Sequence, residues 1–167
     1  DLNQARTIAE KALRSDVRDL GLIFDARPDA HRGLPIDTPE DLATLLHDLP
    51  LADTTLHLDR GPGAVVLLIA LRDSSAFKNA LRGTVGFDPV AALATNTLSE
   101  EDAAFDLSSD LLSTASLSPL RSLSVDLRPY HEAGASAVQE LAFGLGALTE
   151  TVSRLLKRDT SLDAVLD

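Results

Sequence analysis

The stretch 84–94, TVGFDPVAALA, contains the structural unit on which the fold of this chain depends. Residues 84–87 are short and apolar, which favours a buried strand, and residues 90–94 are expected to form a helix after Asp88-Pro89. The same order of strand, aspartate and helix recurs along the chain. Because strands that alternate with helices pair in parallel through right-handed crossovers, the pattern predicts an α/β fold on a parallel sheet.

Three further units follow this layout, and a helix at 2–17 precedes them. Their strands are predicted at 21–25, 54–59 and 122–126, and the remaining helices at 38–49, 64–71, 99–113 and 133–157. Four such units make half of a (β/α)₈ barrel, which takes about 250 residues in full. We therefore expect residues 1–167 to form a single domain, either an open doubly wound sheet or a partial (β/α)₈ barrel.

The segment 133–157 is expected to be the longest helix of the chain. Its apolar residues recur with helical spacing, which predicts that one face of the helix packs against the core. The residues expected to face inward are Val138, Leu141, Leu145, Leu148, Val152 and Leu155.

The composition limits the possible classes of function. The net charge is −11, and no cluster of Lys and Arg suited to nucleic-acid phosphates occurs. The longest apolar run, 64–71, is shorter than the about 20 residues that cross a bilayer, and no signal-peptide pattern occurs at the start. With no Cys in the chain, we expect a cytoplasmic protein without membrane or nucleic-acid partners. With no Met, we expect a processed product or a piece of a longer protein.

An aspartate stands at the end of each predicted strand. Because ligands of parallel α/β folds bind at the carboxyl ends of the strands, these four carboxylates could hold a divalent cation or share a proton. The alternative is that each one caps the next helix or pairs with a nearby arginine, and this interpretation is favoured. The four residues are Asp25, Asp59, Asp88 and Asp126.

Among the histidines, only His131 is placed for chemistry, beside Tyr130 at the carboxyl end of a strand. His31 lies in a predicted loop, His47 on a polar helix position, and His57 within a strand, where packing is the expected role. The Tyr-His pair is therefore the candidate catalytic pair of the chain.

The segment that contains this pair carries a resemblance to a known family. Residues 130–141, YHEAGASAVQEL, resemble the Y-H-x-x-E-A-G-A-x-x-x-Q-E-L segment of methylmalonyl-CoA mutases. Here Tyr-His joins Glu-Ala-Gly directly, as in the non-catalytic small subunits of the family. Residues 33–42, 81–89 and 161–163 resemble further family segments, so the resemblance extends over about 20–167. It implies a partial TIM-type (β/α)₈ barrel.

Three departures from the family pattern bear on function. Catalytic chains carry an N-D-x-x-K-E-x-x-x-R run whose arginine contacts the acyl-CoA, but residues 87–93, FDPVAAL, contain neither Lys nor Arg. Residues 56–60, LHLDR, replace the strand that forms part of the substrate wall. The D-x-H-x-x-G segment of the separate cobalamin-binding domain does not occur. The resemblance thus implies that Tyr130 and His131 are vestigial and that this chain binds no cofactor.

The resemblance implies a small subunit that assembles, as a heterodimer, with a catalytic chain. That large subunit would bind adenosylcobalamin and interconvert methylmalonyl-CoA and succinyl-CoA. The open edges of a half barrel also predict pairing with more barrel or self-association. Two alternatives remain: an active acyl-CoA isomerase fragment that uses Tyr130 and His131, and a small metal-dependent hydrolase that uses the strand-end aspartates.

Overall fold

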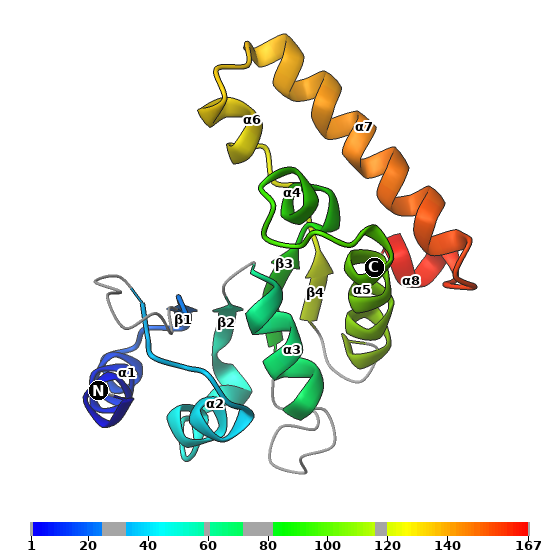
Figure 1. Ribbon diagram of the computed structural model, residues 1–167. Coiled ribbons are helices and arrows are strands. Elements are labelled where there is room, and N and C mark those ends of the chain that lie inside the picture. The colour runs from blue at the N-terminus through cyan, green and yellow to red at the C-terminus, as the bar shows by residue number, and fades with distance from the viewer. Residues whose placement is uncertain (1, 25–32, 59–60, 72–81, 116–119, 167) are drawn as a thin grey trace.

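The computed structural model describes residues 2–24, 33–58, 61–71, 82–115 and 120–166 (Figure 1). Its centre is one parallel sheet with the strand order β1-β2-β3-β4, which confirms the predicted α/β class. The sheet is open and corresponds to part of a (β/α)₈ barrel. The strands are β1 (Asp19–Leu22), β2 (Thr55–Leu58), β3 (Arg82–Phe87) and β4 (Leu120–Leu123).

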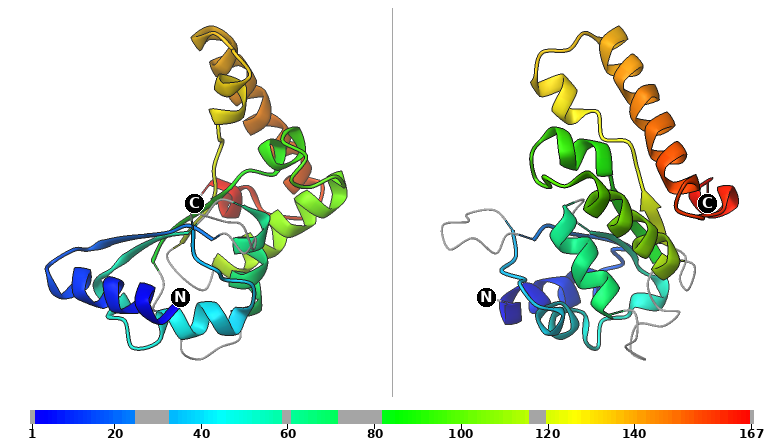
Figure 2. Two further views of the ribbon diagram at one scale, coloured as in Figure 1. Left: turned by 60° about the vertical axis from the view of Figure 1, so that its left-hand side comes forward. Right: turned by 45° about the vertical axis from the view of Figure 1, so that its right-hand side comes forward.

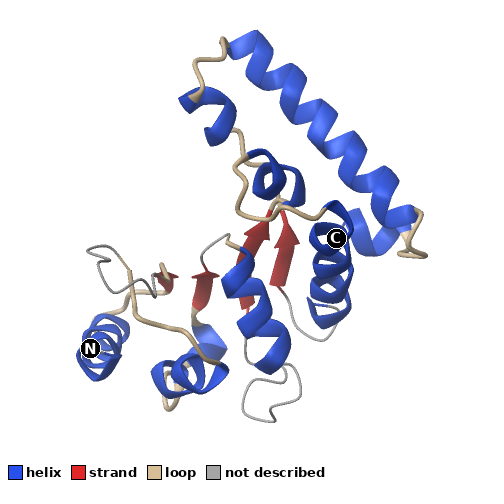
Figure 3. Ribbon diagram, viewed as in Figure 1, coloured by secondary structure: helices blue, strands red, loops and turns tan. Residues whose placement is uncertain are grey.

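Helices connect the strands and alternate with them along the chain, as Figure 3 shows in blue and red. The early helices are α1 (Leu2–Arg14), α2 (Pro39–Leu46), α3 (Pro62–Leu71) and α4 (Pro89–Ala94), with a 3₁₀ turn at Leu51–Asp53. The later helices are α5 (Glu101–Ala115), α6 (Arg128–Glu132), α7 (Ala137–Leu156) and α8 (Leu162–Leu166).

Helix starts are fixed by side chains that satisfy free backbone donors. At α2, the Thr38 hydroxyl accepts from the Asp41 N–H, and the Asp41 carboxylate accepts from the Thr38 N–H. Ser136 and Gln139 form the same reciprocal box at the start of α7. Each box satisfies two of the donors that the first helical turn leaves unpaired.

The core lies between the sheet and the helices on one of its faces. Leu22, Leu56 and Leu58 point into it from the first two strands, and Leu42 and Val65 meet them from α2 and α3. Aliphatic side chains make up most of this core, as the low aromatic content of 4% predicts. The hydrophobic effect of their burial is the main contribution to stability.

Gly83 lies at a close approach between the backbones of β2 and β3. Its φ is +139°, and a Cβ at this position would lie 1.9 Å from the carbonyl oxygen of Leu56. Only glycine fits both the backbone conformation and the space. The pairing of Leu56 with Gly83 therefore depends on this residue.

The structure corrects three predicted boundaries. The first strand begins at Asp19 rather than Gly21, because pairing with β2 starts at the Asp19–Thr55 partners. The fourth strand is Leu120–Leu123 rather than 122–126. The predicted helix 133–157 begins later, as α7 at Ala137, and a separate helix, α6, precedes it, because Gly134 adopts a φ of +89° between the two.

The prediction that α7 turns its apolar stripe inward is wrong for most of the stripe. Val138 is 79% exposed and Leu141 is 62% exposed, whereas Leu155 is fully buried. The buried face instead contains Ala147 and Thr151. The physical reason is that no described strand lies beyond β4, so that the apolar side of the helix has nothing to pack against.

The carboxyl-terminal half of α7 is anchored on α5, while its start stands away from the sheet together with α6 (Figure 2). The guanidinium of Arg158 pairs with Asp102 and Asp106, at 2.6 and 2.8 Å, and lies over the Phe105 ring. Arg154 adds an ion pair with Glu101. These contacts place α6, together with the amino-terminal half of α7, beyond the carboxyl ends of the strands.

Candidate functional site

A cavity of about 330 Å³ lies at the carboxyl ends of β3 and β4, between α4 and α6. This is the edge of a parallel sheet where ligands of α/β proteins bind. The cavity therefore defines the candidate site. Its lining consists of Gly61, Pro62, Asp88, Ala91, Ala92, Thr95, Thr97, Asp126, Arg128, Pro129 and Glu132.

The carboxylate of Asp88 is used in structural hydrogen bonds. Its Oδ1 accepts from the N–H groups of Val90 and Ala91, both at 2.9 Å, and so caps α4. Its Oδ2 accepts from the backbone N–H of Asp126 at 2.6 Å. The side chain is 5% exposed. The capping interpretation of the strand-end aspartates is thus confirmed at Asp88.

Asp126 pairs with Arg128 two residues further along the chain. The Arg128 Nε lies 3.0 Å from both carboxylate oxygens, and Nη2 lies 2.6 Å from Oδ2. The carboxylate is almost buried, whereas the arginine side chain is 69% exposed. This geometry confirms the expected local ion pair, and it directs the guanidinium of Arg128 onto a protein carboxylate.

The electrostatics of the cavity are consequently unfavourable for anions. Among the described residues of the lining, Asp88, Asp126 and Glu132 contribute three carboxylates, and Arg128 contributes one cation. Since Arg128 is paired with Asp126, the remaining charge of the described lining is negative. A phosphate or carboxylate ligand would be repelled by these groups.

Tyr130 lies on α6 beside the cavity and stacks on Phe143 of α7. The ring centroids are 5.2 Å apart with an interplanar angle of 28°, a stacked arrangement that fixes the phenol. Partial burial, together with the negative charge of Asp88, raises the pKa of Tyr130 above its usual value of 10.0. The phenol therefore stays protonated at neutral pH.

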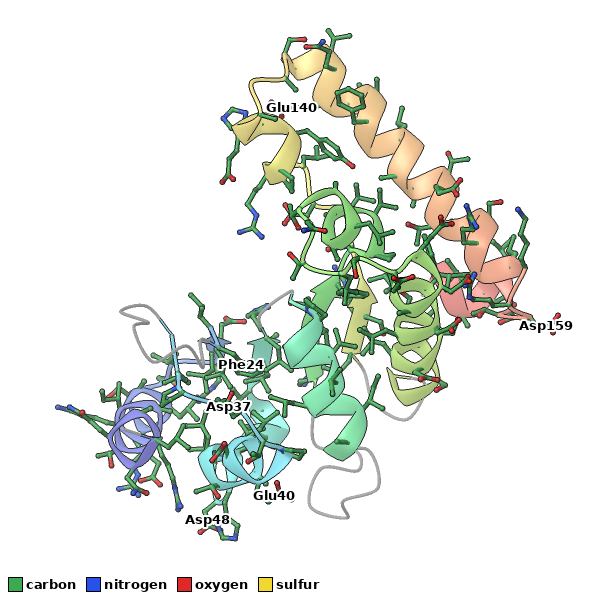
Figure 4. All side chains as sticks on the ribbon, viewed as in Figure 1. Phe24, Asp37, Glu40, Asp48, Glu140 and Asp159 are labelled. Carbon is green, nitrogen blue, oxygen red and sulfur yellow. The ribbon has the colours of Figure 1, made fainter. Side chains whose placement is uncertain are left out.

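His131, the other member of the candidate pair, points to the start of α7 and not into the cavity. Its Nδ1 lies 2.7 Å from Oε1 of Glu140, a residue labelled in Figure 4. The imidazole is 75% exposed. The hydrogen bond to Glu140 and the charge of that carboxylate raise the pKa of His131 above 6.5. The structure thus separates the adjacent residues Tyr130 and His131, with different partners on α7.

The four strand-end aspartates are described only in part. Asp25 and Asp59 lie outside the described residues, whereas Asp88 and Asp126 are joined through the hydrogen bond above. Within the described ranges, no three His, Cys, Asp or Glu side chains gather closely enough to hold a metal ion.

A polar cluster on the opposite face of the sheet was missed by the sequence interpretation. His57 is exposed and not packed, because its strand presents it on the face opposite the core. Its Nδ1 lies 2.9 Å from the Thr84 hydroxyl, and its Nε2 lies 3.5 Å from Asp19. In the strand register, His57 is paired with Gly21 on one side and with Thr84 on the other. This register would have predicted the cluster, but it cannot be read from the sequence before the strand pairing is known.

None of the helices in the described part of the chain combines the length and the apolar character that crossing a membrane requires.

The fold and the site define the class of protein: an α/β chain built as part of a (β/α)₈ barrel, with a polar cavity at the carboxyl ends of its strands. Residues 28–167 match the family described as Methylmalonyl-CoA mutase, and the chain belongs to this family. The methylmalonyl-CoA mutase small subunit of Streptomyces virginiae is 34% identical over 129 residues. The alignment covers 74% of this chain and 20% of that protein, so the chain spans about one fifth of the length of the relative.

Proposed function

We propose that this chain is part of a non-catalytic small subunit of a methylmalonyl-CoA mutase. It assembles with a catalytic large subunit and stabilises it. The large subunit binds adenosylcobalamin and interconverts methylmalonyl-CoA and succinyl-CoA, whereas this chain holds no cofactor of its own. The complex functions in the cytoplasm. The membership in the mutase family and the small-subunit relative support this proposal.

The observation that carries the proposal is the negative charge of the cavity. A coenzyme A thioester bears phosphates, and the methylmalonyl group adds a carboxylate, so that a binding site needs positive groups. The cavity lining instead contains Asp88, Asp126 and Glu132, and its arginine is paired internally. Burying the negative groups of such a ligand beside these carboxylates would be strongly unfavourable.

The contacts of the Tyr-His pair support a structural role. Tyr130 stacks on Phe143 and His131 bonds to Glu140, so both residues tie α6 to α7. A general acid or base must instead lie within hydrogen-bond reach of the proton that it transfers. His131 is directed at a carboxylate of its own chain and away from the cavity, which favours the vestigial interpretation.

The experiment is co-expression of this chain, carrying an affinity tag, with an untagged adenosylcobalamin-dependent large subunit of a mutase. We expect both chains in the eluate at equal stoichiometry, and a higher midpoint of thermal unfolding for the large subunit than it has alone. Elution of the tagged chain alone, with no change in that midpoint, would contradict the proposal.

Variants of the same complex distinguish the alternatives. We expect His131→Gln and Tyr130→Phe to leave mutase turnover within about twofold of the parent complex, since neither residue acts in catalysis here. Loss of an acid or base typically costs about 10²–10⁴-fold, and such a loss would favour the active isomerase. A stoichiometric divalent metal in elemental analysis of the purified chain would favour the hydrolase.

A further inference from the structure

The short helix α6 forms part of the wall of the cavity. Arg128, Pro129 and Glu132 belong to the lining and lie on α6. Ala91 and Ala92 line the cavity from α4, and each of them is only 7% exposed. The cavity thus extends from α6 to buried side chains of α4. A change in the position of α6 would therefore change the access of solvent to these side chains.

The position of α6 is set mainly by its contacts with α7. Among the helices and strands of the described chain, α7 is the one against which α6 chiefly packs. Figure 2 shows the two together, away from the sheet. The ion pair of Arg128 with Asp126 fixes the first residue of α6 to the segment after β4. The rest of α6 takes its place from α7.

Two side-chain contacts join these helices. Tyr130 stacks on Phe143 with the ring centroids 5.2 Å apart, and His131 Nδ1 lies 2.7 Å from Glu140 Oε1. Glu140 and Phe143 are three residues apart, so they are neighbours on the surface of α7. Because Tyr130 and His131 are also adjacent, the two contacts form one joint. This joint lies within residues 130–143 and is independent of any segment outside the chain.

The connection between α6 and α7 is short, and each helix has its own cap. Gly134 ends α6 with a φ of +89°, and its N–H donates to His131 O. Ser136 starts α7 as the N-cap residue, and its hydroxyl accepts from the Gln139 N–H. Ala135 lies between the two caps. The backbone around Ala135 can therefore act as a hinge, because a rotation there moves α6 as a unit.

The contact between His131 and Glu140 changes with pH. Histidine is the side chain whose ordinary pKa places its change of charge between about pH 5 and 8. The hydrogen bond to Glu140 on α7 and the charges of Glu140 and of Glu132 on α6 itself raise the pKa of His131 above 6.5. Below the raised value the contact is an ion pair. Above it the imidazole is neutral, and the attraction between opposite charges is lost.

We propose that α6 is a flap over the cavity, that His131 and Glu140 latch it to α7, and that loss of the proton of His131 releases it. In the latched state α6 covers the lining residues of α4. In the released state the Phe143 stack holds α6 less firmly, so that the flap spends more time away from the cavity. This inference goes beyond the proposed function and holds for the chain with or without a partner subunit.

The first test uses the fluorescence of Tyr130. Tyr130 is the one tyrosine of the chain, which has no tryptophan, so this signal reports on α6 alone. Acrylamide, a neutral quencher, is applied to the full 167-residue chain at about pH 5.5 and about pH 9. The pKa of Tyr130 is raised above 10.0, so the phenol stays protonated at both values. We expect the quenching constant to rise about twofold or more with pH.

Matched variants assign this change to the latch. We expect His131→Gln to show, at both pH values, the high quenching constant that the parent has at the higher pH, because an amide does not titrate. His47→Gln is the control, since His47 is also exposed and also paired with a carboxylate, that of Asp48 at 2.8 Å. It should behave as the parent does. Circular dichroism checks that each variant is folded.

Three outcomes of the quenching experiment would overturn the inference. The first is a parent constant that is equal at both pH values. The second is a pH dependence that persists in His131→Gln, and the third is a low constant for this variant at both values.

The second test measures access to the cavity itself. The chain has no Cys, so Ala91→Cys places a single thiol on the α4 wall. Labelling by a small neutral maleimide is compared with and without His131→Gln at the same pH, which cancels the ionisation of the thiol. We expect labelling to be about threefold or more slower without His131→Gln at about pH 6, and equally fast at about pH 9. Equal rates at the lower pH would show that α6 does not cover the cavity and would overturn the proposal.

Discussion

The backbone N–H of Asp126 donates a hydrogen bond of 2.6 Å to Oδ2 of Asp88, a residue 38 positions earlier in the chain. The other oxygen of the same carboxylate caps α4. One side chain therefore fixes the ends of β3 and β4 relative to each other and starts the next helix. In the sequence, Asp88 and Asp126 resemble part of a set of metal ligands. In the structure, they connect the carboxyl ends of β3 and β4 at the mouth of the partial barrel.

Removal of this carboxylate is expected to destabilise the fold. We expect Asp88→Ala to lower the free energy of unfolding by about 2–4 kcal/mol, because a helix cap contributes about 1 kcal/mol and a buried unsatisfied N–H costs about 1–3 kcal/mol. Urea unfolding followed by circular dichroism measures the change. Asp37→Ala, at an exposed aspartate, is the control and should stay within about 0.5 kcal/mol of the parent. Equal losses for both variants would refute the role given to Asp88.

The close approach of β2 and β3 makes a second prediction. Gly83→Ala places a Cβ against Leu56 O in a backbone conformation that alanine rarely adopts, so we expect a loss of about 4 kcal/mol or more, or no soluble protein. Gly21→Ala is the matched strand glycine, because a Cβ there meets nothing within 4 Å. Its stability should change by about 1 kcal/mol at most. Soluble yield and urea midpoints compare the two, and a Gly83→Ala protein as stable as the parent would contradict this packing.

Two glycines of α7 give a third matched comparison. A Cβ at Gly146 meets nothing within 4 Å, whereas a Cβ at Gly144 would press on the Leu127 side chain at 2.6 Å. We expect Gly146→Ala to raise the free energy of unfolding by about 0.5–1 kcal/mol through helix propensity, and Gly144→Ala to gain less or to destabilise. Thermal unfolding of both variants shows which of the two is more stable. The opposite order would mean that α7 does not rest on the segment after β4.

The bond between His131 and Glu140 predicts a pH dependence of stability. The pKa of His131 is raised in the folded chain, so the pair stabilises the fold fully below the unfolded-state pKa of about 6.5, and this contribution is lost as the pH rises through the raised value. The stability difference between the parent and His131→Gln should therefore be larger at about pH 6 than at about pH 9. NMR titration of the His131 imidazole in Glu140→Gln should show a lower pKa than in the parent. An unchanged pKa there would exclude Glu140 as the cause.

The sequence predicted the alternation of strands and helices because each unit has local signals. The Thr38-Pro39 start of α2 and the Asp88-Pro89 start of α4 are such signals, and the structure has helices at both. The parallel order of the strands followed from that alternation. Capping at Asp88 could also be predicted, since the acid and its helix are adjacent in the chain.

Other features depend on contacts between distant residues and could not be predicted in this way. The periodicity of α7 identifies an apolar stripe, yet whether Leu141 is buried depends on what lies beyond β4. The exposure of His57 depends on which face of β2 packs on the helices. The separation of Tyr130 from His131 depends on the turn at Gly134, which brings Glu140 and Phe143 next to α6.

Isothermal titration of this chain alone with methylmalonyl-CoA, and separately with adenosylcobalamin, tests most directly whether its cavity has lost the ability to bind substrate and cofactor. We expect no binding heat for either ligand at concentrations up to about 1 mM, which corresponds to a binding free energy weaker than about 4 kcal/mol. Saturable binding of methylmalonyl-CoA that is abolished by His131→Gln would contradict the account, because it would make the Tyr-His corner a working site.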